Sequence, residues 1–256
     1  MVAGGLKGAD GGGALNDLMR DTWLEVDLKQ LRKNVEALKD TLGNGVQIYA
    51  VLKANAYGCG LEAMGRALIE LGIPLLAVAT LSEALILRSV HKTWPVLVMG
   101  PTPIRLMGEA LRRDIQLTLV QPEEVSALEA LARNEQLVAK VQIKVDTGLR
   151  RVGFSFEEAA FHEIRRIFAS QWLSVTGVFS HLALVNWETD QLQLSRFLAV
   201  RGRLESAGLS GGVPFHISDS ISGIAYPDFR LDAVRIGAAL YRSEEHTSEL
   251  QSRHNL

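Results

Sequence analysis

A repeat of short apolar runs, most of them followed by a stretch with helical period, constrains the fold of this chain more than any other feature. Counting from Val46, eight apolar runs begin near residues 46, 75, 96, 116, 141, 174, 213 and 234. Strands that alternate with helices form parallel sheets, because each helix carries the chain back to the start of the next strand. Eight units in about 200 residues favour a closed (β/α)8 barrel of the TIM type, in the α/β class, over an open sheet.

The spacing also predicts single elements. Residues 46–54 are expected to form the first strand of the barrel, with Lys53 at its end. A strand over residues 22–28 is surplus to the eight, and Ser82 is expected to cap a helix over residues 82–90. Residues 234–240 would be the last strand. The helix after residue 28 would bury one apolar face, made of Leu28, Leu31, Val35 and Leu38.

Composition excludes several classes of function. The chain is 47% hydrophobic and 22% charged, and no apolar run reaches the roughly 18 residues of a membrane helix, so no membrane partner is expected. The net charge of -2 leaves no basic stripe for a nucleic-acid partner. A single cysteine, Cys59, cannot form an internal disulfide and fits a reducing cytoplasm. Scattered histidines without a C-x-x-C or H-E-x-x-H motif predict no metal site.

Reactive side chains follow the predicted strands at their C-terminal ends, where barrels of this type carry their chemistry. The candidates are Lys53 at the end of the first strand, Lys144 and Arg151 at and just after the fifth, His181 at the end of the sixth, Ser220 after the seventh, and Arg235, Gly237 and Ala238 in the eighth. A single site built from these residues is therefore expected.

The motif VLKANAYGCG (residues 51–60) points to a particular chemistry. Apolar neighbours would desolvate the amine of Lys53 and lower its pKa, which suits a nucleophile or base in Schiff-base chemistry. The small-residue turn after it leads into a helix near Leu61, and a turn of this kind is where phosphate groups bind. A lysine beside a phosphate seat predicts pyridoxal phosphate as cofactor. An exposed lysine at a strand end is the alternative.

Five motifs together, VLKANAYGCG, KVDTGLRRVGF (residues 144–154), FSHLA (179–183), HISDS (216–220) and VRIGAALY (234–241), resemble those of the alanine racemases. This pyridoxal-phosphate family has a barrel domain followed by a β domain, and the surplus strand over residues 22–28 would belong with the β domain. Matches run from Thr22 to Tyr241. The chain departs from the family at Cys59, where histidine is usual, at Arg150, where glycine is common, and at Asp219, where asparagine is common.

The resemblance implies a role for each candidate. Lys53 would carry the cofactor, Arg151 would contact the phenolic oxygen of the cofactor and the substrate carboxylate, and His181 would hydrogen-bond the second catalytic base. Arg235 would bond the pyridine nitrogen, and Lys144 matches a lysine that is often carbamylated. Contacts to the phosphate would come from four residues, Tyr57, Ser220, Gly237 and Ala238.

The residues alone also allow plainer interpretations. Lys144 would serve equally in a structural ion pair. Arg235 would pair with a carboxylate such as Asp232, because an unpaired buried charge is costly. A histidine beside apolar residues, as His181 is, is commonly a packed core residue. The glycines and serines would act as ordinary turn residues.

By this resemblance the chain is the barrel half of an amino-acid racemase. Three parts are expected: a flexible tail over residues 1–20, a pyridoxal-phosphate-binding barrel over 21–242, and a non-native tail over 243–256 that resembles adapter read-through. The family interconverts L- and D-alanine for peptidoglycan in a cytoplasmic homodimer. Its two bases are a lysine, here Lys53, and a tyrosine of the partner subunit's β domain, so the chain alone is expected to be inactive.

Three other functions stay open at this point. They are a serine racemase domain of the vancomycin-resistance type, a D-threonine aldolase, and a non-catalytic barrel that binds pyridoxal phosphate. The spacing of KVDTGLRRVGF and VRIGAALY favours a racemase over an aldolase. Alanine and serine are not separated as substrates.

Overall fold

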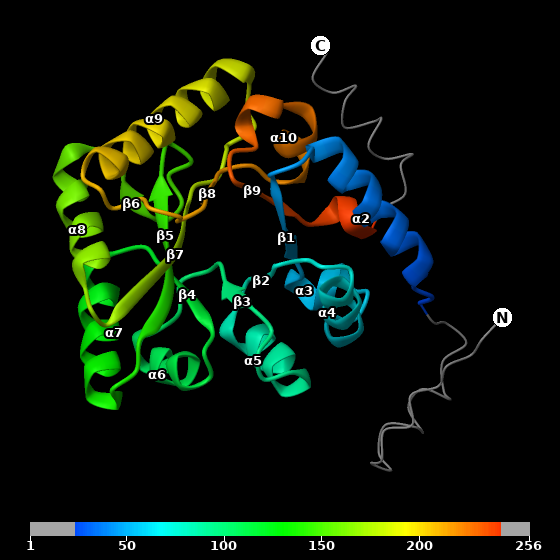
Figure 1. The fold of residues 1–256 in the computed structure, drawn as a ribbon, viewed down its shortest axis with the longest axis horizontal. Coiled ribbons are helices and arrows are strands. Elements are labelled where there is room, and N and C mark those ends of the chain that lie inside the picture. The colour runs from blue at the N-terminus through cyan, green and yellow to red at the C-terminus, as the bar shows by residue number, and fades with distance from the viewer. Residues whose placement is uncertain (1–23, 242–256) are drawn as a thin grey trace.

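Eight parallel strands form a ring in the computed structural model of the chain, which describes residues 24–241 (Figure 1). The strands are β1 (Gln47–Val51), β2 (Leu75–Val78), β3 (Val96–Val98), β4 (Gln116–Leu119), β5 (Ala139–Asp146), β7 (Leu173–Phe179), β8 (Phe215–His216) and β9 (Ala233–Ile236). Hydrogen-bonded neighbours follow the order β8, β7, β5, β4, β3, β2, β1, β9. The predicted (β/α)8 barrel is confirmed.

Between β8 and β9 the ring closes through two isolated main-chain hydrogen bonds. The N–H of Asp232 donates to the carbonyl of Phe215, and the N–H of Arg235 donates to the carbonyl of Ser218, both at 3.1 Å. The side chain of Asp232 adds a third bond, because it accepts the N–H of Phe215 at 2.7 Å. This joint therefore depends on fewer ladder bonds than the regular strand pairs.

Helices cover the outside of the ring (Figure 1). They are α2 (Leu28–Leu42), α4 (Leu61–Glu70), α5 (Leu81–Val90), α6 (Ile104–Arg112), α7 (Pro122–Glu135), α8 (Glu158–Ala169) and α9 (Trp187–Ser206). Shorter elements lie at the strand ends: α3 (Lys53–Tyr57), β6 (Phe154–Ser155), which pairs with β5, α10 (Ser220–Ala225), a 3-10 turn (Pro227–Phe229) and α11 (Ala238–Tyr241). Helix α2 packs beside α11, where the Asn34 amide donates to the Leu240 carbonyl at 3.0 Å.

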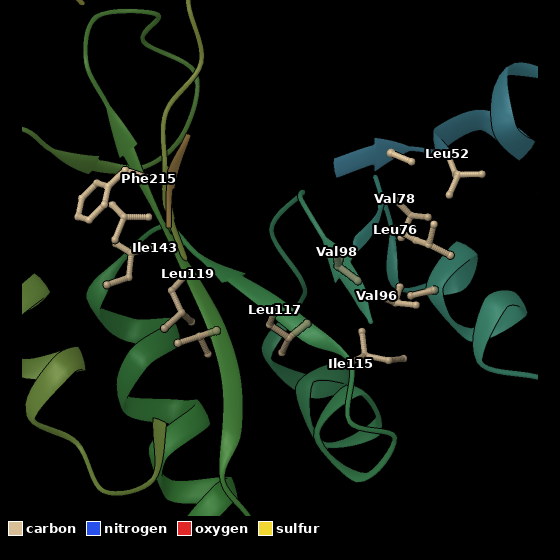
Figure 2. Packing of buried hydrophobic residues seen from close by; sticks show 14 of the residues in the cluster. Leu52, Leu76, Val78, Val96, Val98, Ile115, Leu117, Leu119, Ile143 and Phe215 are labelled. Atoms are coloured by element: carbon tan, nitrogen blue, oxygen red, sulfur yellow. The ribbon is translucent and has the colours of Figure 1, made fainter. Parts of the chain in front are cut away.

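Alternate residues of each strand face the helices and form the main core. Figure 2 shows this layer, with Leu76, Val78, Val96, Val98, Leu117, Leu119, Ile143 and Phe215 among its labelled residues. Helix residues such as Met64, Leu68 and Leu87 belong to the same cluster. The twofold period of a strand places the remaining side chains inside the ring. Burial of these apolar side chains is the main force that holds the helices to the sheet.

The inside of the ring has an apolar part and a polar part. Tyr49, Leu75, Leu97 and Ala233 form a small separate cluster. Strands β5, β8 and β9 instead contribute the buried polar residues Gln142, Lys144, His216 and Arg235. Because buried polar and charged groups are costly unless they are bonded, this second set indicates a functional interior.

The strand predicted over residues 22–28 is wrong in its described part. Residues 24–27 form no strand, and Leu28 begins α2. Asp27 caps the helix, because its carboxylate accepts the N–H of Lys29 at 2.8 Å and of Gln30 at 3.2 Å. A strand also needs a partner, and none lies beside this segment within residues 24–241. Leu28 itself is exposed rather than on the buried face of the helix.

Other predicted boundaries also need correction. Strand β1 ends at Val51, two residues before Lys53. Thr80, and not Ser82, caps α5, because its hydroxyl forms a capping box with Glu83. Strand β9 ends at Ile236, and Gly237 with Ala238 lies at the start of α11. The tails predicted over residues 1–20 and 243–256 lie outside the described residues.

Candidate active site

One cavity of about 430 Å³ lies at the C-terminal ends of the strands, a size typical of small-molecule sites. All nine candidate residues line it: Lys53, Tyr57, Lys144, Arg151, His181, Ser220, Arg235, Gly237 and Ala238. The convergence of residues from five strand ends was the expectation from the sequence. The lining that was missed includes Ala79, Met99, Gly100, Pro101 and Phe179. Most of these also follow strand ends, so the same rule applied to β2 and β3 would have found them.

Lys53 begins a left-handed turn. The next four residues, Ala54, Asn55, Ala56 and Tyr57, all have φ between +54° and +55°. Residues other than glycine lose about 1–2 kcal/mol each in this conformation, because Cβ crowds the following carbonyl. Such a segment persists only where its surroundings over-determine it, and it is often found at functional sites. The turn carries the chain from β1 toward α4.

The desolvation predicted for Lys53 is not provided by this chain. The lysine side chain is exposed, and its Nζ lies 5.9 Å from the centre of the Tyr57 ring. The reason is geometric: the strand ends at Val51, so the turn lifts Lys53 to the rim of the cavity. The Lys53 side chain nevertheless lines the same cavity as the other candidate residues.

Three potential phosphate donors lie together beside α10 and α11. The N–H of Gly237 donates to the Ser220 hydroxyl at 3.0 Å. A Cβ at position 237 would collide with the Tyr57 hydroxyl, so glycine leaves room for that hydroxyl beside its own N–H. Burial, followed by the nearby Asp219 carboxylate, raises the pKa of Tyr57, which keeps the phenol protonated as a donor.

Asp219, one of the departures from the family pattern, caps α10. Its Oδ1 accepts the N–H groups of Ile221 and Ser222, each at 3.0 Å. The hydroxyl of Ser222 donates to the same oxygen at 3.0 Å. Capping explains how a carboxylate is held beside a phosphate seat, because its charge interacts favourably with the positive end of the helix.

Arg235 is buried at the cavity and is bonded to neutral acceptors. Its Nη1 donates to His216 Nδ1 at 2.7 Å, and its Nη2 donates to His181 Nδ1 at 3.1 Å. The carbonyls of His216, Ser180 and Ile217 accept from it at 3.3, 2.8 and 2.9 Å. Asp232 is not among these partners, so the plainer interpretation does not hold. Burial lowers the pKa of Arg235 to about 10, which leaves the guanidinium charged at neutral pH.

Burial, followed by the charge of this arginine, holds the two histidines neutral. Burial and then Arg235 lower the pKa of His181 to about 3 and that of His216 well below its ordinary value. His216 accepts from Arg235 at Nδ1, so its Nε2–H donates to Gln142 Oε1 at 3.0 Å. His216 also stacks on Phe179, with the ring centres 5.1 Å apart. Neither His216 nor Gln142 was a candidate from the sequence.

Lys144 lies inside the ring, and its side chain is almost completely buried. Burial, then the charges of Arg235 and Arg151, lower the pKa of Lys144 to about 7. Its Nζ lies 5.4 Å from the centre of the Phe179 ring. Within residues 24–241 no ion pair joins Lys144 or Arg235 to a carboxylate. The floor of the cavity is therefore positive and suited to an anionic ligand.

The Asp146 carboxylate holds the backbone turn that leads to Arg151. The carboxylate accepts the N–H groups of Gly148, Arg150 and Arg151 at 2.9, 3.0 and 2.8 Å. Although burial opposes it, these bonds lower the pKa of Asp146 below its ordinary value. Arg150 has φ of +57°, a conformation that glycine adopts without strain. A glycine at position 150 would therefore relieve this strain.

The residues present fit pyridoxal phosphate. An amine for the carbonyl carbon comes from Lys53. The absence of a Cβ at Gly237 lets the Tyr57 hydroxyl lie beside Gly237 and Ser220, so that these three residues line one part of the cavity as a cradle for the phosphate. Arg235 is a charged donor at the floor of the same cavity. No group of three metal-binding side chains occurs in the described part of the chain. No helix between residues 24 and 241 is long and apolar enough to cross a bilayer.

Comparisons with known proteins all match alanine racemases. The family model "Alanine racemase, N-terminal domain" matches residues 26–245. Alanine racemase 2 of Caldanaerobacter subterraneus is 36% identical over 232 residues, which cover 89% of this chain and 59% of that protein. Alanine racemase 1 of Oceanobacillus iheyensis is 35% identical over 225 residues, covering 87% and 60%.

Solved structures give the same picture. The alanine racemase of Clostridium difficile in complex with cycloserine has a TM-score of 0.83 at 30% identity, covering 88% of this chain and 64% of that chain. The alanine racemase from Bacillus anthracis with bound L-Ala-P has a TM-score of 0.80 at 32% identity, covering 90% and 61%. The chain therefore spans about 60% of the length of the curated relatives that it matches.

Proposed function

Because the chain belongs to the alanine racemase family, we propose that it is the cofactor-bearing barrel of a pyridoxal-phosphate-dependent racemase that interconverts L- and D-alanine. The observation that carries the proposal is the convergence of Lys53, the phosphate cradle and Arg235 on one cavity. The relatives reported above are all alanine racemases, which favours this activity over an aldolase. A supply of D-alanine for peptidoglycan would be the corresponding cellular role.

Each candidate residue receives a role in this proposal. When bound, pyridoxal phosphate supplies an electron-withdrawing ring that stabilises negative charge at the substrate α-carbon. Lys53 takes or returns the α-proton at Nζ on one face of the substrate. Arg151 clamps the substrate carboxylate, since a guanidinium forms paired bonds with it. The N–H donors of Gly237 and Ala238 and the hydroxyls of Ser220 and Tyr57 hold the phosphate.

Arg235 and His181 tune the site. A guanidinium that remains charged would donate to the pyridine nitrogen and would keep that nitrogen unprotonated, which would moderate the pull of the ring on electrons. His181, kept neutral by burial and by Arg235, would offer its other ring nitrogen to the second base. Lys144 has a pKa of about 7, so much of its amine is neutral at pH 7 and open to carbamylation. A carbamate there would place a negative group beside the cations of Arg151 and Arg235.

The second base is proposed to come from outside the described residues. Tyr57 is the one tyrosine that lines the cavity within residues 24–241, and it belongs to the phosphate cradle. A tyrosine from the other domain of a partner subunit, in a homodimer, would supply the opposite face. Residues 21–242 are then the barrel domain. We expect the chain by itself to bind cofactor but to racemise alanine weakly or not at all.

Reconstitution tests the cofactor assignment. The purified chain is incubated with pyridoxal phosphate, and the visible absorption band of the protein-bound cofactor is recorded before and after gel filtration. Lys53→Ala is expected to lose the band, whereas Lys140→Ala, which removes an exposed lysine paired with Asp114, is expected to retain it. A wild-type chain without the band, or a band of equal strength in Lys53→Ala, contradicts the proposal.

A further inference from the structure

The residue that follows Lys53 is held by a side chain from the next β/α unit. The N–H of Ala54 donates to Glu83 Oε1 at 2.6 Å, and Glu83 lies 29 residues later, in the first turn of α5. Within the described residues, this is the one side-chain hydrogen bond that reaches the left-handed turn 54–57 from another β/α unit. The other side-chain bond of the turn, from Leu61 N–H to Asn55 Oδ1 at 2.8 Å, is local.

The carboxylate of Glu83 is also held by contacts within its own β/α unit. Its Oε2 accepts the N–H groups of Ala79 and Thr80 at 2.9 and 3.1 Å and the Thr80 hydroxyl at 3.3 Å. The carboxylate also lies at the positive end of α5, where negative charge is stabilised. A rigid acceptor anchored at the end of β2 thus reaches across to the segment that follows β1.

Capping alone does not explain this arrangement. A capping box needs one carboxylate oxygen for the N-cap residue, and in α5 that oxygen is Oε2, which serves Thr80. The other oxygen serves Ala54, which is not part of α5. The same side chain therefore does two separable things: it caps a helix, and it fixes the peptide between Lys53 and Ala54.

We propose that Glu83 is a positioning residue for Lys53. By holding the N–H of Ala54 it stabilises the start of the left-handed turn and sets the direction in which the lysine side chain enters the cavity. The inference rests on the proposed function, in which Lys53 carries pyridoxal phosphate. The contact belongs to the protein without cofactor, so it can be tested separately.

Three variants separate positioning from capping. Glu83→Ala removes both contacts. Thr80→Ala breaks the capping box but leaves Ala54 bonded to Glu83. Glu83→Gln retains the size of the side chain and keeps a single oxygen, so it cannot accept from both segments. Circular dichroism verifies the fold of each, and Glu83→Gln replaces Glu83→Ala if the alanine variant does not fold.

Two readouts are measured on the full chain. Amide hydrogen exchange at Ala54 is measured without cofactor. The fraction of Lys53 trapped by borohydride after incubation with pyridoxal phosphate is measured by peptide mass analysis. In Glu83→Ala we expect faster exchange at Ala54 and about a tenfold weaker affinity in the trapping titration, as expected for losing a charge-assisted hydrogen bond. Thr80→Ala is expected to lower the melting temperature while both readouts stay at the wild-type level.

The outcomes distinguish the two proposals. If Glu83→Ala and Glu83→Gln exchange at Ala54 as slowly as wild type, or if Thr80→Ala reduces trapping as much as they do, Glu83 is only a helix cap and the inference fails. If wild type shows no trapping at Lys53, the proposed function fails. Slow exchange at Ala54 that depends on Glu83 would in that case still support the positioning contact.

Discussion

Replacing Lys144 by methionine should change how the stability of the barrel depends on pH. The pKa of this buried lysine is lowered from 10.5 to about 7, chiefly by burial. Between these two values the unfolded chain binds more protons than the folded chain, so the free energy of unfolding rises with pH. The penalty is fully present below pH 7 and is gone above about pH 10.5. The separation of the two pKa values corresponds to about 5 kcal/mol.

The measurement is urea denaturation, followed by tryptophan fluorescence at several pH values from 6 to 10. The stability advantage of Lys144→Met over wild type should shrink by about 1.4 kcal/mol for each pH unit above 7. Lys140→Met is the matched control, because Lys140 lies on the same strand but is 44% exposed and pairs with Asp114 at 2.7 Å. Parallel curves for wild type and Lys144→Met would refute the reasoning.

Bicarbonate extends the same test to the proposed carbamate. A neutral amine at pH 8 reacts with dissolved carbon dioxide and releases a proton, so a carbamate on Lys144 would replace a neutral amine by an anion beside Arg151 and Arg235. Added bicarbonate should therefore raise the melting temperature of wild type and leave Lys144→Met unchanged. Labelled bicarbonate should give a carbamate carbon signal in NMR that the variant lacks. Equal responses of both proteins would exclude the modification.

Three further changes have expected outcomes. Arg150→Gly removes a side chain at φ +57° and should stabilise the fold by up to about 1 kcal/mol in urea denaturation, whereas a loss of stability would contradict the strain. Gly237→Ala should weaken pyridoxal phosphate binding in calorimetry because its Cβ meets the Tyr57 hydroxyl, and adding Tyr57→Phe should recover part of the folding stability but not the binding. Gln142→Leu leaves the buried Nε2–H of His216 without its acceptor, and it should cost about 1–3 kcal/mol of unfolding free energy; an unchanged stability would show that the bond contributes little.

The barrel could be predicted from the sequence because its signals are local. Each apolar run with its following helix is recognisable by itself, and the rule that chemistry lies at the strand ends then selects Lys53, Lys144 and Arg151 without any knowledge of distances. The twofold alternation of residues in β5 contains a further signal. Gln142 and Lys144 alternate with apolar residues, and buried polar residues on one face of a strand indicate an interior network.

The left-handed turn could not be predicted in the same way. Asn55 tolerates this conformation, but Ala54 and Ala56 disfavour it, and alanine is among the best formers of right-handed helix. The start of the turn is held by a hydrogen bond to Glu83, which is remote in the chain. The exposure of Lys53 follows from that turn, which is why the predicted desolvation was wrong. The short helix α10 was not predicted, because its six residues are too few to show a helical period, although aspartate at position 219 is a residue type that favours the N-cap.

Arg235 also helps to close the barrel at the joint between β8 and β9, in addition to its proposed effect on the cofactor. Its backbone belongs to β9, while its guanidinium grips the carbonyls of Ser180 and Ile217 on the far side of the joint. The Arg235 side chain therefore links β9 to the ends of β7 and β8, at the place in the ring where no strand ladder forms. A substitution at position 235 should therefore change both the charge at the floor of the cavity and the closure of the barrel.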